Sequence, residues 1–186
     1  MAIHIQPNPA TSVAERVLLP GDPQRALAVA QALLESPLML NAARGLWGYT
    51  GRAADGGLVT VQSTGMGGPS AAIVTEELIA LGARTLIRIG TCGALDAGLS
   101  IGDLVAVDKA LALDGTSRAL GAGAEVVEME AATVLTVAQR HGVPAACLLG
   151  VTDLLDGGRT RLEREAVDEL GVELGATALQ ALATTR

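Results

Sequence analysis

The chain has 186 residues, of which 49% are hydrophobic and 1% aromatic, and it carries a formal net charge of −7. This length and apolar content exclude a disordered chain and predict a single domain, residues 1–186, with a sizeable core. The acidic balance argues against a general binder of nucleic acid or of anionic membranes, and with only Trp47 and Tyr49 as aromatic residues a base-stacking surface is poorly supplied.

The two cysteines and the N-terminal segment indicate an intracellular protein. Cys92 and Cys147 stand in apolar, strand-like surroundings, which predicts two buried thiols and no disulfide framework. Residues 1–15 are predicted to be irregular, with His4 at the surface or at a strand edge. They lack the basic start and apolar stretch of a signal peptide, and no apolar run approaches the length of a membrane span. We therefore expect a cytoplasmic location.

The first predicted helix carries a candidate anion-binding residue. A short strand at 16–19 is followed by a helix from 23 to about 35, because Asp22 suits a helix N-cap and Pro23 a first helical position. Arg25 falls in the first helical turn, where a cation opposes the helix dipole. It is either a solvated surface arginine or the partner of an anion bound at the helix N-terminus.

The stretch 59–95 predicts a strand, a glycine turn at 65–68, a helix at 70–81 and a second strand at 85–89. Arg88 lies within this second strand and is followed by a Gly-Thr-Cys-Gly run. A buried arginine is costly unless it holds an anion. The sequence therefore predicts an anion site at the carboxyl end of this strand, where backbone N–H groups gather.

The second half of the chain adds acidic candidates. A helix is predicted at 125–141, and within it Glu128 and Glu130 are about 200° apart around the axis, so that one of them points inward. Thr152 and Asp153 follow an apolar strand at 145–151, where an aspartate serves either chemistry or helix capping. The other predicted elements are a glycine-rich turn at 44–51, a hairpin turn at 53–57, a strand at 104–107 and a last helix at 162–182 that Arg159, Arg161 and Arg164 precede or open.

Common nucleotide and metal motifs are absent from the sequence. The Gly65-Met66-Gly67-Gly68 turn is followed by Ser70 where a dinucleotide-binding fingerprint needs glycine, and there is no P-loop. Two histidines and no clustered cysteines leave no candidate ligand set for a metal.

Six segments together resemble the nucleoside phosphorylase family, in particular hexameric purine nucleoside phosphorylases and uridine phosphorylases. They occur in the order of the family and leave only the region around 115–124 without a counterpart. The segments are VLLPGDPQRA (17–26), RGLWGYTG (44–51), STGMGGPSAAIVTEELIALGA (63–83), IRIGTCGAL (87–95), VEMEAA (127–132) and VTD (151–153).

The resemblance implies a fold, a reaction and a set of site residues. The fold is a three-layer α/β/α sandwich around a mixed, partly barrel-like sheet, and the reaction is phosphorolysis of a nucleoside by inorganic phosphate as co-substrate, without a metal or redox cofactor. The implied phosphate-binding residues are Gly21, Arg25, Arg44, Arg88 and Thr91. The implied ribose contacts are His4, Met66, Met129 and Glu130.

On the base side, the resemblance implies contacts from Thr152 and Asp153. Asp153 would donate a proton to the leaving purine, and Arg164 would assist this aspartate. The implied assembly is a homo-oligomer, a hexamer built as a trimer of dimers, in which a neighbouring subunit supplies His4 and Arg44.

One segment of the family is missing between 117 and 128, so the connection near 115–125 is shortened. In relatives this segment supplies a helix, a strand and an aromatic residue that stacks on the base. The base pocket is therefore expected to be open on one side, at a cost of about 1–3 kcal/mol if stacking is lost.

The leading interpretation is a purine nucleoside phosphorylase, a pentosyltransferase that releases free base and ribose 1-phosphate. A uridine phosphorylase is the close alternative. The alternative from another class is a catalytically impaired oligomer that binds nucleoside or phosphate.

Overall fold

The computed structural model describes residues 2–111, 124–155 and 160–184. Within these residues, nine strands form one mixed sheet, with β1–β4, β1–β5 and β5–β8 as its parallel pairs. The strands are β1 (Arg16–Pro20), β2 (Glu35–Asn41), β3 (Gly48–Arg52), β4 (Leu58–Gln62), β5 (Thr85–Ala94), β6 (Leu104–Ala106), β7 (Val126–Val127), β8 (Ala145–Leu154) and β9 (Thr160–Arg161). The main path runs β2-β3-β4-β1-β5-β8-β6, and β7 and β9 extend β5 and β8 at one end.

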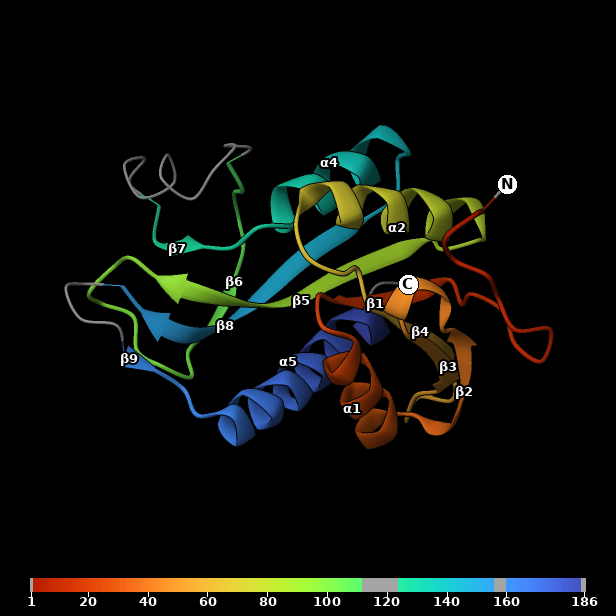
Figure 1. Ribbon diagram of the computed structural model, residues 1–186, viewed down its shortest axis with the longest axis horizontal. Coiled ribbons are helices and arrows are strands. Elements are labelled where there is room, and N and C mark those ends of the chain that lie inside the picture. Colours follow the sequence, from red (N-terminus) through yellow and green to blue (C-terminus); the bar gives the residue numbers. More distant parts are fainter. Residues whose placement is uncertain (1, 112–123, 156–159, 185–186) are drawn as a thin grey trace.

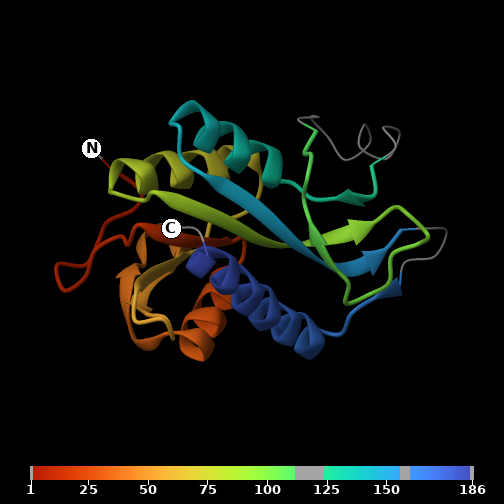
Figure 2. The same ribbon diagram turned by 180° about the vertical axis from the view of Figure 1, so that it is seen from behind.

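Helices cover both faces of this sheet. The described residues contain α1 (Pro23–Leu33), α2 (Gly68–Ala80), α4 (Ala131–Arg140), α5 (Arg164–Thr184) and a short 3₁₀ helix, η1 (Ala43–Gly45). Helices α2 and α4 lie together on one side, and α1 and α5 lie together on the other, as both views show (Figures 1 and 2). The predicted α/β/α sandwich around a mixed sheet is confirmed.

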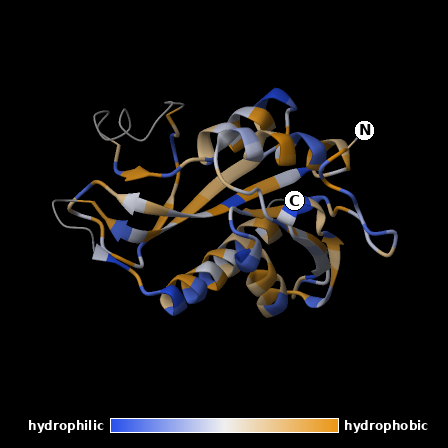
Figure 3. Cartoon of the chain, viewed as in Figure 1, coloured by the Kyte–Doolittle hydropathy of each residue, from blue (hydrophilic) through white to orange (hydrophobic). Residues whose placement is uncertain are grey.

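The core lies between these layers because successive strand residues face opposite sides of the sheet. In β1, Leu18 packs in the cluster of α1 and α5 that contains Leu174. Its neighbours Val17 and Leu19 pack in the cluster of α2 and α4 that contains Val74. Figure 3 shows hydrophobic residues along the central strands, and hydrophobic and hydrophilic residues on each helix, as expected for helices that cover a sheet.

The structure confirms the helix cap predicted before α1 and the glycine turn predicted before α2. Asp22 caps α1, where its Oδ1 accepts a hydrogen bond from the Arg25 backbone N–H at 2.9 Å. Before α2, Gly67 has a φ of 86°, a conformation that glycine adopts without steric cost. These two turns place Arg25 and the Gly65–Gly68 loop at the same edge of the sheet, beyond the carboxyl ends of β1 and β4.

Both cysteines are buried, as predicted. Cys92 and Cys147 are each 3% exposed and are free thiols on the neighbouring strands β5 and β8. Burial raises the pKa of each thiol to about 12, so both stay protonated. None of the helices in the described part of the chain is long and apolar enough to cross a bilayer.

Several predicted boundaries are wrong. The helix predicted at 125–141 begins only at Ala131, because residues 126–127 form β7 against the end of β5. The last helix begins at Arg164, because Thr160 and Arg161 pair with β8. The turn predicted at 44–51 is strand from Gly48 onward, and β2 was not predicted at all.

The shortened connection falls mostly outside the described residues. The sequence prediction of no clear element at 115–124 therefore stays untested for 115–123, as does the domain count.

Candidate functional site

The side chain of Arg88 forms the centre of a buried ionic cluster. It is 3% exposed, although it lies in the central strand β5. Its Nε and Nη2 each donate to Glu128 Oε2 at 3.2 Å, and Nη2 also donates to Glu130 Oε2 at 2.6 Å. Its Nη1 donates to the Leu19 carbonyl at 3.4 Å. The anion that a buried arginine requires is thus supplied by two carboxylates of the protein itself.

Two glycines leave room for the Arg88 guanidinium. A Cβ at Gly90 would lie 2.7 Å from Arg88 Nη2, so a side chain there would collide with the guanidinium. A Cβ at Gly21 would lie 3.6 Å from Nη1. Gly21, which directly follows β1, therefore lies beside Nη1 of Arg88, and their shared role in binding phosphate stays a prediction.

Both acidic residues before α4 point inward, whereas the helical wheel predicted this of one of them. They precede the helix, so the helical wheel does not apply to them. The side chains of Glu128 and Glu130 are 10% and 7% exposed. Glu130 Oε1 also accepts a hydrogen bond from the Gly67 N–H, which joins the start of α4 to the loop before α2.

The two implied ribose-contacting methionines lie on these joined loops. Met66 directly precedes Gly67 and is 80% exposed, and Met129 lies between the two glutamates and is 55% exposed. An exposed apolar side chain beside a buried carboxylate suits a sugar, whose hydroxyl groups and ring face need different partners.

Arg25 lies at the start of α1, next to α5. Its aliphatic stem passes over α5, because a Cβ at Gly171 would lie 2.9 Å from Arg25 Cγ. Burial lowers the pKa of Arg25, the charge of Asp22 raises it, and the positive charge of Arg88 lowers it further. The two arginines are therefore close enough to repel each other, and an anion between them would relieve this repulsion.

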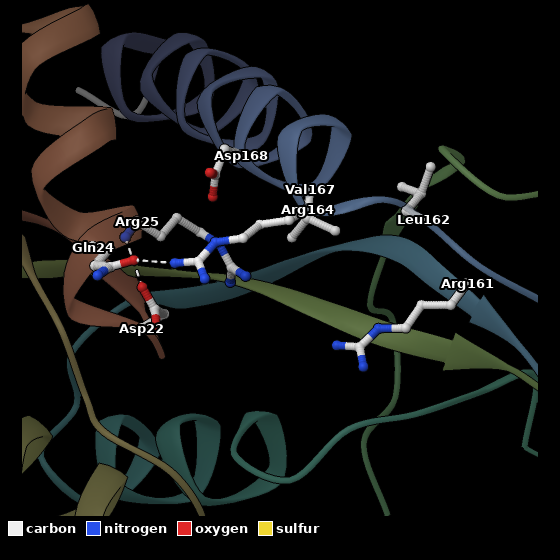
Figure 4. A pocket seen from close by; sticks show the side chains of 8 residues that line it. All are labelled: Asp22, Gln24, Arg25, Arg161, Leu162, Arg164, Val167 and Asp168. Carbon is white, nitrogen blue, oxygen red and sulfur yellow. Dashed lines mark hydrogen bonds between the residues drawn. The ribbon is translucent and has the colours of Figure 1, made fainter.

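A cavity of about 400 Å³ opens beside Arg25, between the N-terminal ends of α1 and α5 (Figure 4). In Figure 4, Arg164 extends toward Gln24, and its Nη2 donates to Gln24 Oε1 at 2.7 Å. The cavity is lined by Asp22, Gln24, Arg25, Arg161, Leu162, Arg164, Val167 and Asp168. Three arginines against two aspartates give it a cationic wall.

The base-side candidates lie near the end of β8. Thr152 Oγ1 is 2.9 Å from Asp153 Oδ2 and 3.3 Å from the Cys92 carbonyl. Asp153 is 15% exposed, and Arg161 Nε lies 3.7 Å from its Oδ1. Asp153 pairs within the sheet with Arg161 of β9, so the helix-capping alternative is wrong. Arg161 therefore lies beside this aspartate, whereas Arg164 donates to Gln24, and the predicted assistance of Asp153 by Arg164 stays a prediction.

Thr91 lies three residues beyond Arg88 on β5 and is half-buried opposite Gly150 of β8. It therefore lies on the strand that carries the Arg88 cluster.

His4 and Arg44 lie on two segments that are tied together at the surface. His4 Nδ1 is 2.7 Å from Glu77 Oε1. Arg44 is exposed in η1, with a left-handed φ of 56°. Asn41 Oδ1 accepts from the backbone N–H of Gln6 at 3.0 Å, which joins the two segments. Among the described residues, neither His4 nor Arg44 bonds to the Arg88 cluster.

Sequence reasoning missed the roles of Glu128, Arg161 and Glu77. The Glu-Met-Glu spacing was a usable signal for the first, because residues two apart in an extended chain have their side chains on the same side. The other two depend on pairings across the fold that no local pattern shows.

Comparison with known proteins places the chain in a family. The model of a family described as the phosphorylase superfamily matches residues 15–123 and 119–185. The chain is a member of the nucleoside phosphorylase family. The resemblance of the six segments is thereby confirmed.

Individual members of the nucleoside phosphorylase family align over most of the chain. A protein of Oceanobacillus iheyensis named "Purine nucleoside phosphorylase DeoD-type" is 34% identical over 98% of this chain and 81% of its own length. A protein of the same name from Caldanaerobacter subterraneus subsp. tengcongensis is 35% identical over 89% of this chain and 93% of its own length. That alignment spans 218 residues, more than this chain contains, so the relative has residues without a counterpart here.

Proposed function

We propose that this protein catalyses the reversible phosphorolysis of purine nucleosides to free base and ribose 1-phosphate. The observation that carries the proposal is the direct contact of Arg88 with Glu130, at 2.6 Å, beside Gly21 and within the field of Arg25. Such an arrangement offers cations for phosphate and a carboxylate for sugar hydroxyls in adjoining places. Relatives named purine nucleoside phosphorylase support the same reaction and the choice of purine over uridine.

The chemistry follows from charge. A phosphate oxygen forms a bond to the sugar C1′ while the bond from C1′ to the base nitrogen breaks, and the sugar becomes oxocarbenium-like between the two events. The Glu130 carboxylate would orient the sugar hydroxyls and stabilise this positive charge. The base leaves with the bonding electron pair, and Asp153 would donate a proton to its N7 as general acid. Arg161, on the adjacent strand, would hold the resulting carboxylate.

The proposal includes an assembly in which a second subunit completes the site. His4 and Arg44 would contribute to the ribose and phosphate sites of a neighbour in a hexamer. The support is that the two segments are joined through Asn41 and that Glu77 anchors the segment of His4, so that one docking event would deliver both.

No metal or redox cofactor is part of this proposal. The described residues contain no group of three or more His, Cys, Asp or Glu side chains that could hold a metal. Absence of a cofactor stays a prediction, as does the cytoplasmic location, and dialysis against a chelator without loss of turnover would support the first.

The test is release of base from inosine, guanosine and uridine, with and without inorganic phosphate, followed by chromatography. Arg25→Ala is the informative variant, because Arg88→Ala would leave two buried carboxylates unpaired and endanger the fold. Arg140→Ala, which removes a 71% exposed arginine, is the matched control. We expect phosphate-dependent release from the purine nucleosides that Arg25→Ala reduces and Arg140→Ala does not.

Three other outcomes would overturn the proposal. Release without phosphate would indicate a nucleosidase, and preferential release from uridine would indicate a uridine phosphorylase. No release from folded protein would favour the impaired oligomer that binds nucleoside or phosphate.

A further inference from the structure

The guanidinium of Arg88 has almost no free hydrogen-bond capacity. Of its five N–H groups, the one on Nε and one on Nη2 point to Glu128, the second on Nη2 points to Glu130, and one on Nη1 points to the Leu19 carbonyl. No acceptor among the described residues takes the second N–H on Nη1, and Gly21 lies near this nitrogen. Arg88 therefore cannot grip a phosphate with two parallel hydrogen bonds unless a carboxylate releases it.

The second carboxylate oxygen of Glu128 is also held by hydrogen bonds. Its Oε1 accepts from the backbone N–H of Glu130 at 3.0 Å and of Ala131 at 2.6 Å. Glu128 thus caps the first turn of α4 while it holds the Nε–Nη2 edge of Arg88. Moving it away from Arg88 would break the cap and shift the backbone that carries Glu130.

The cluster of Arg88, Glu128 and Glu130 carries a net negative charge. Glu128 and Glu130 together carry two negative charges against one on Arg88, so the inner part of the site is negative before any anion enters. A phosphate dianion that approaches Nη1 meets both carboxylates at short range, in surroundings where charges interact more strongly than in water. Arg25, at the start of α1, then has to supply most of the attraction.

We propose that Glu128 is a positioning residue that limits the affinity of this site for phosphate, because its negative charge, held against the Nε–Nη2 edge of Arg88, offsets the attraction of that arginine for the anion. The identity of the ligand rests on the proposed function. Glu128 also couples the two halves of the site, since the same carboxylate fixes the phosphate-side cation and the helix start that presents Glu130. Its removal therefore tightens phosphate binding, a gain that loss of structure does not produce.

The experiment is a calorimetric titration of the full chain with inorganic phosphate at constant pH and ionic strength. Glu128→Gln keeps the length and an oxygen acceptor but removes the charge. Glu128→Thr and Glu128→Asp each introduce a short residue that can cap a helix. The two introduced residues differ in charge, so the variants form a matched pair. Glu76→Gln, on the exposed side of α2, is the control for the substitution itself.

We expect Glu128→Gln and Glu128→Thr to bind phosphate about tenfold more tightly than the wild type, the size expected for removing one partly screened charge nearby. Glu128→Asp and Glu76→Gln stay within about twofold of the wild type by the same reasoning. Equal or weaker binding in both neutral variants, with far-UV circular dichroism unchanged, would overturn the proposal. Tighter binding in Glu128→Asp as well would assign the effect to geometry and also overturn it.

The base-release assay separates this proposal from the proposed function. If the wild type shows no phosphorolysis and the neutral variants still bind phosphate more tightly, the function fails and the role of Glu128 stands. If phosphorolysis is present and phosphate affinity does not rise in the neutral variants, the function stands and the role of Glu128 fails. Absence of phosphate binding in every variant contradicts both.

Discussion

The Glu77 carboxylate of α2 holds the N-terminal segment, and we predict that Glu77→Ala lowers the free energy of unfolding by about 2 kcal/mol at neutral pH. Its two oxygens accept hydrogen bonds from the backbone N–H groups of Ile3, His4 and Ile5 at 3.0, 2.9 and 2.7 Å, and His4 Nδ1 lies 2.7 Å away. The Glu77 side chain is 13% exposed. Truncation would leave these donors without their shared acceptor.

The size of the effect follows from the pKa of Glu77. Burial raises this pKa, but the hydrogen bonds from the Ile5 N–H, the His4 ring and the N–H groups of Ile3 and His4 outweigh burial and lower it from 4.5 to about 2. A shift of this size corresponds to about 3 kcal/mol. Rehydration of the released N–H groups at the surface reduces the expected loss to about 2 kcal/mol.

The sign of the pH dependence provides the stricter test. Because the pKa of Glu77 is lower in the folded than in the unfolded state, its contribution is complete above pH 4.5 and is lost as the pH falls toward 2. Urea unfolding of the wild type, Glu77→Ala and Glu76→Ala at neutral pH and near pH 3 measures it. Glu76 is 39% exposed, so its truncation costs under about 1 kcal/mol. A deficit of Glu77→Ala that equals the deficit of Glu76→Ala, or that persists unchanged at low pH, would refute the reasoning.

Two further predictions concern Gly171, which contacts Arg25, and Arg161, which lies beside Asp153. Both use steady-state kinetics with inosine and phosphate. Gly171→Ala places a methyl group 2.9 Å from Arg25 Cγ and should raise the KM for phosphate about tenfold, whereas Gly175→Ala crowds α1 elsewhere and should cost about 1–3 kcal/mol of stability without changing this KM. Equal KM values in the two variants would contradict the positioning of Arg25 by α5. Arg161→Ala should lower kcat about tenfold with the phosphate KM unchanged, because Asp153 loses its cationic neighbour at 3.7 Å. An unchanged kcat would remove Arg161 from the mechanism.

Local signals predicted the parts of the site that local chemistry builds. Asp22 and Pro23 mark the start of α1, and an arginine within an apolar strand predicts a buried cation with a bound anion. These features depend on neighbours within a few residues, so a single sequence contains them. Gly67, at the turn before α2, belongs to the same class.

The remaining parts depend on contacts between distant segments. Glu128 and Arg88 are 40 residues apart, and their contact ends the helical pattern that continues from α4 into residues 125–130. The pairing of Arg161 with Asp153 similarly required knowledge that residues 160–161 return alongside β8. Tertiary pairing overrides helical periodicity at residues 125–130, and no propensity scale contains that term.

The two longest strands, β5 and β8, have shorter neighbouring strands near their carboxyl ends than around Arg88. Around Arg88, β5 has β1 on one side and β8 on the other, whereas at residues 93–94 its neighbours are β8 and the two-residue β7. Strand pairing is therefore most extensive around Arg88 and least extensive at Asp153, which lies on an arm of two strands with short flanking pairs (Figure 1). We expect amides of the arm to exchange by local fluctuations, and those around Arg88 to exchange only on global unfolding. Under the proposed function, the phosphate site would therefore be rigid, and the general acid would lie on the least constrained part of the sheet.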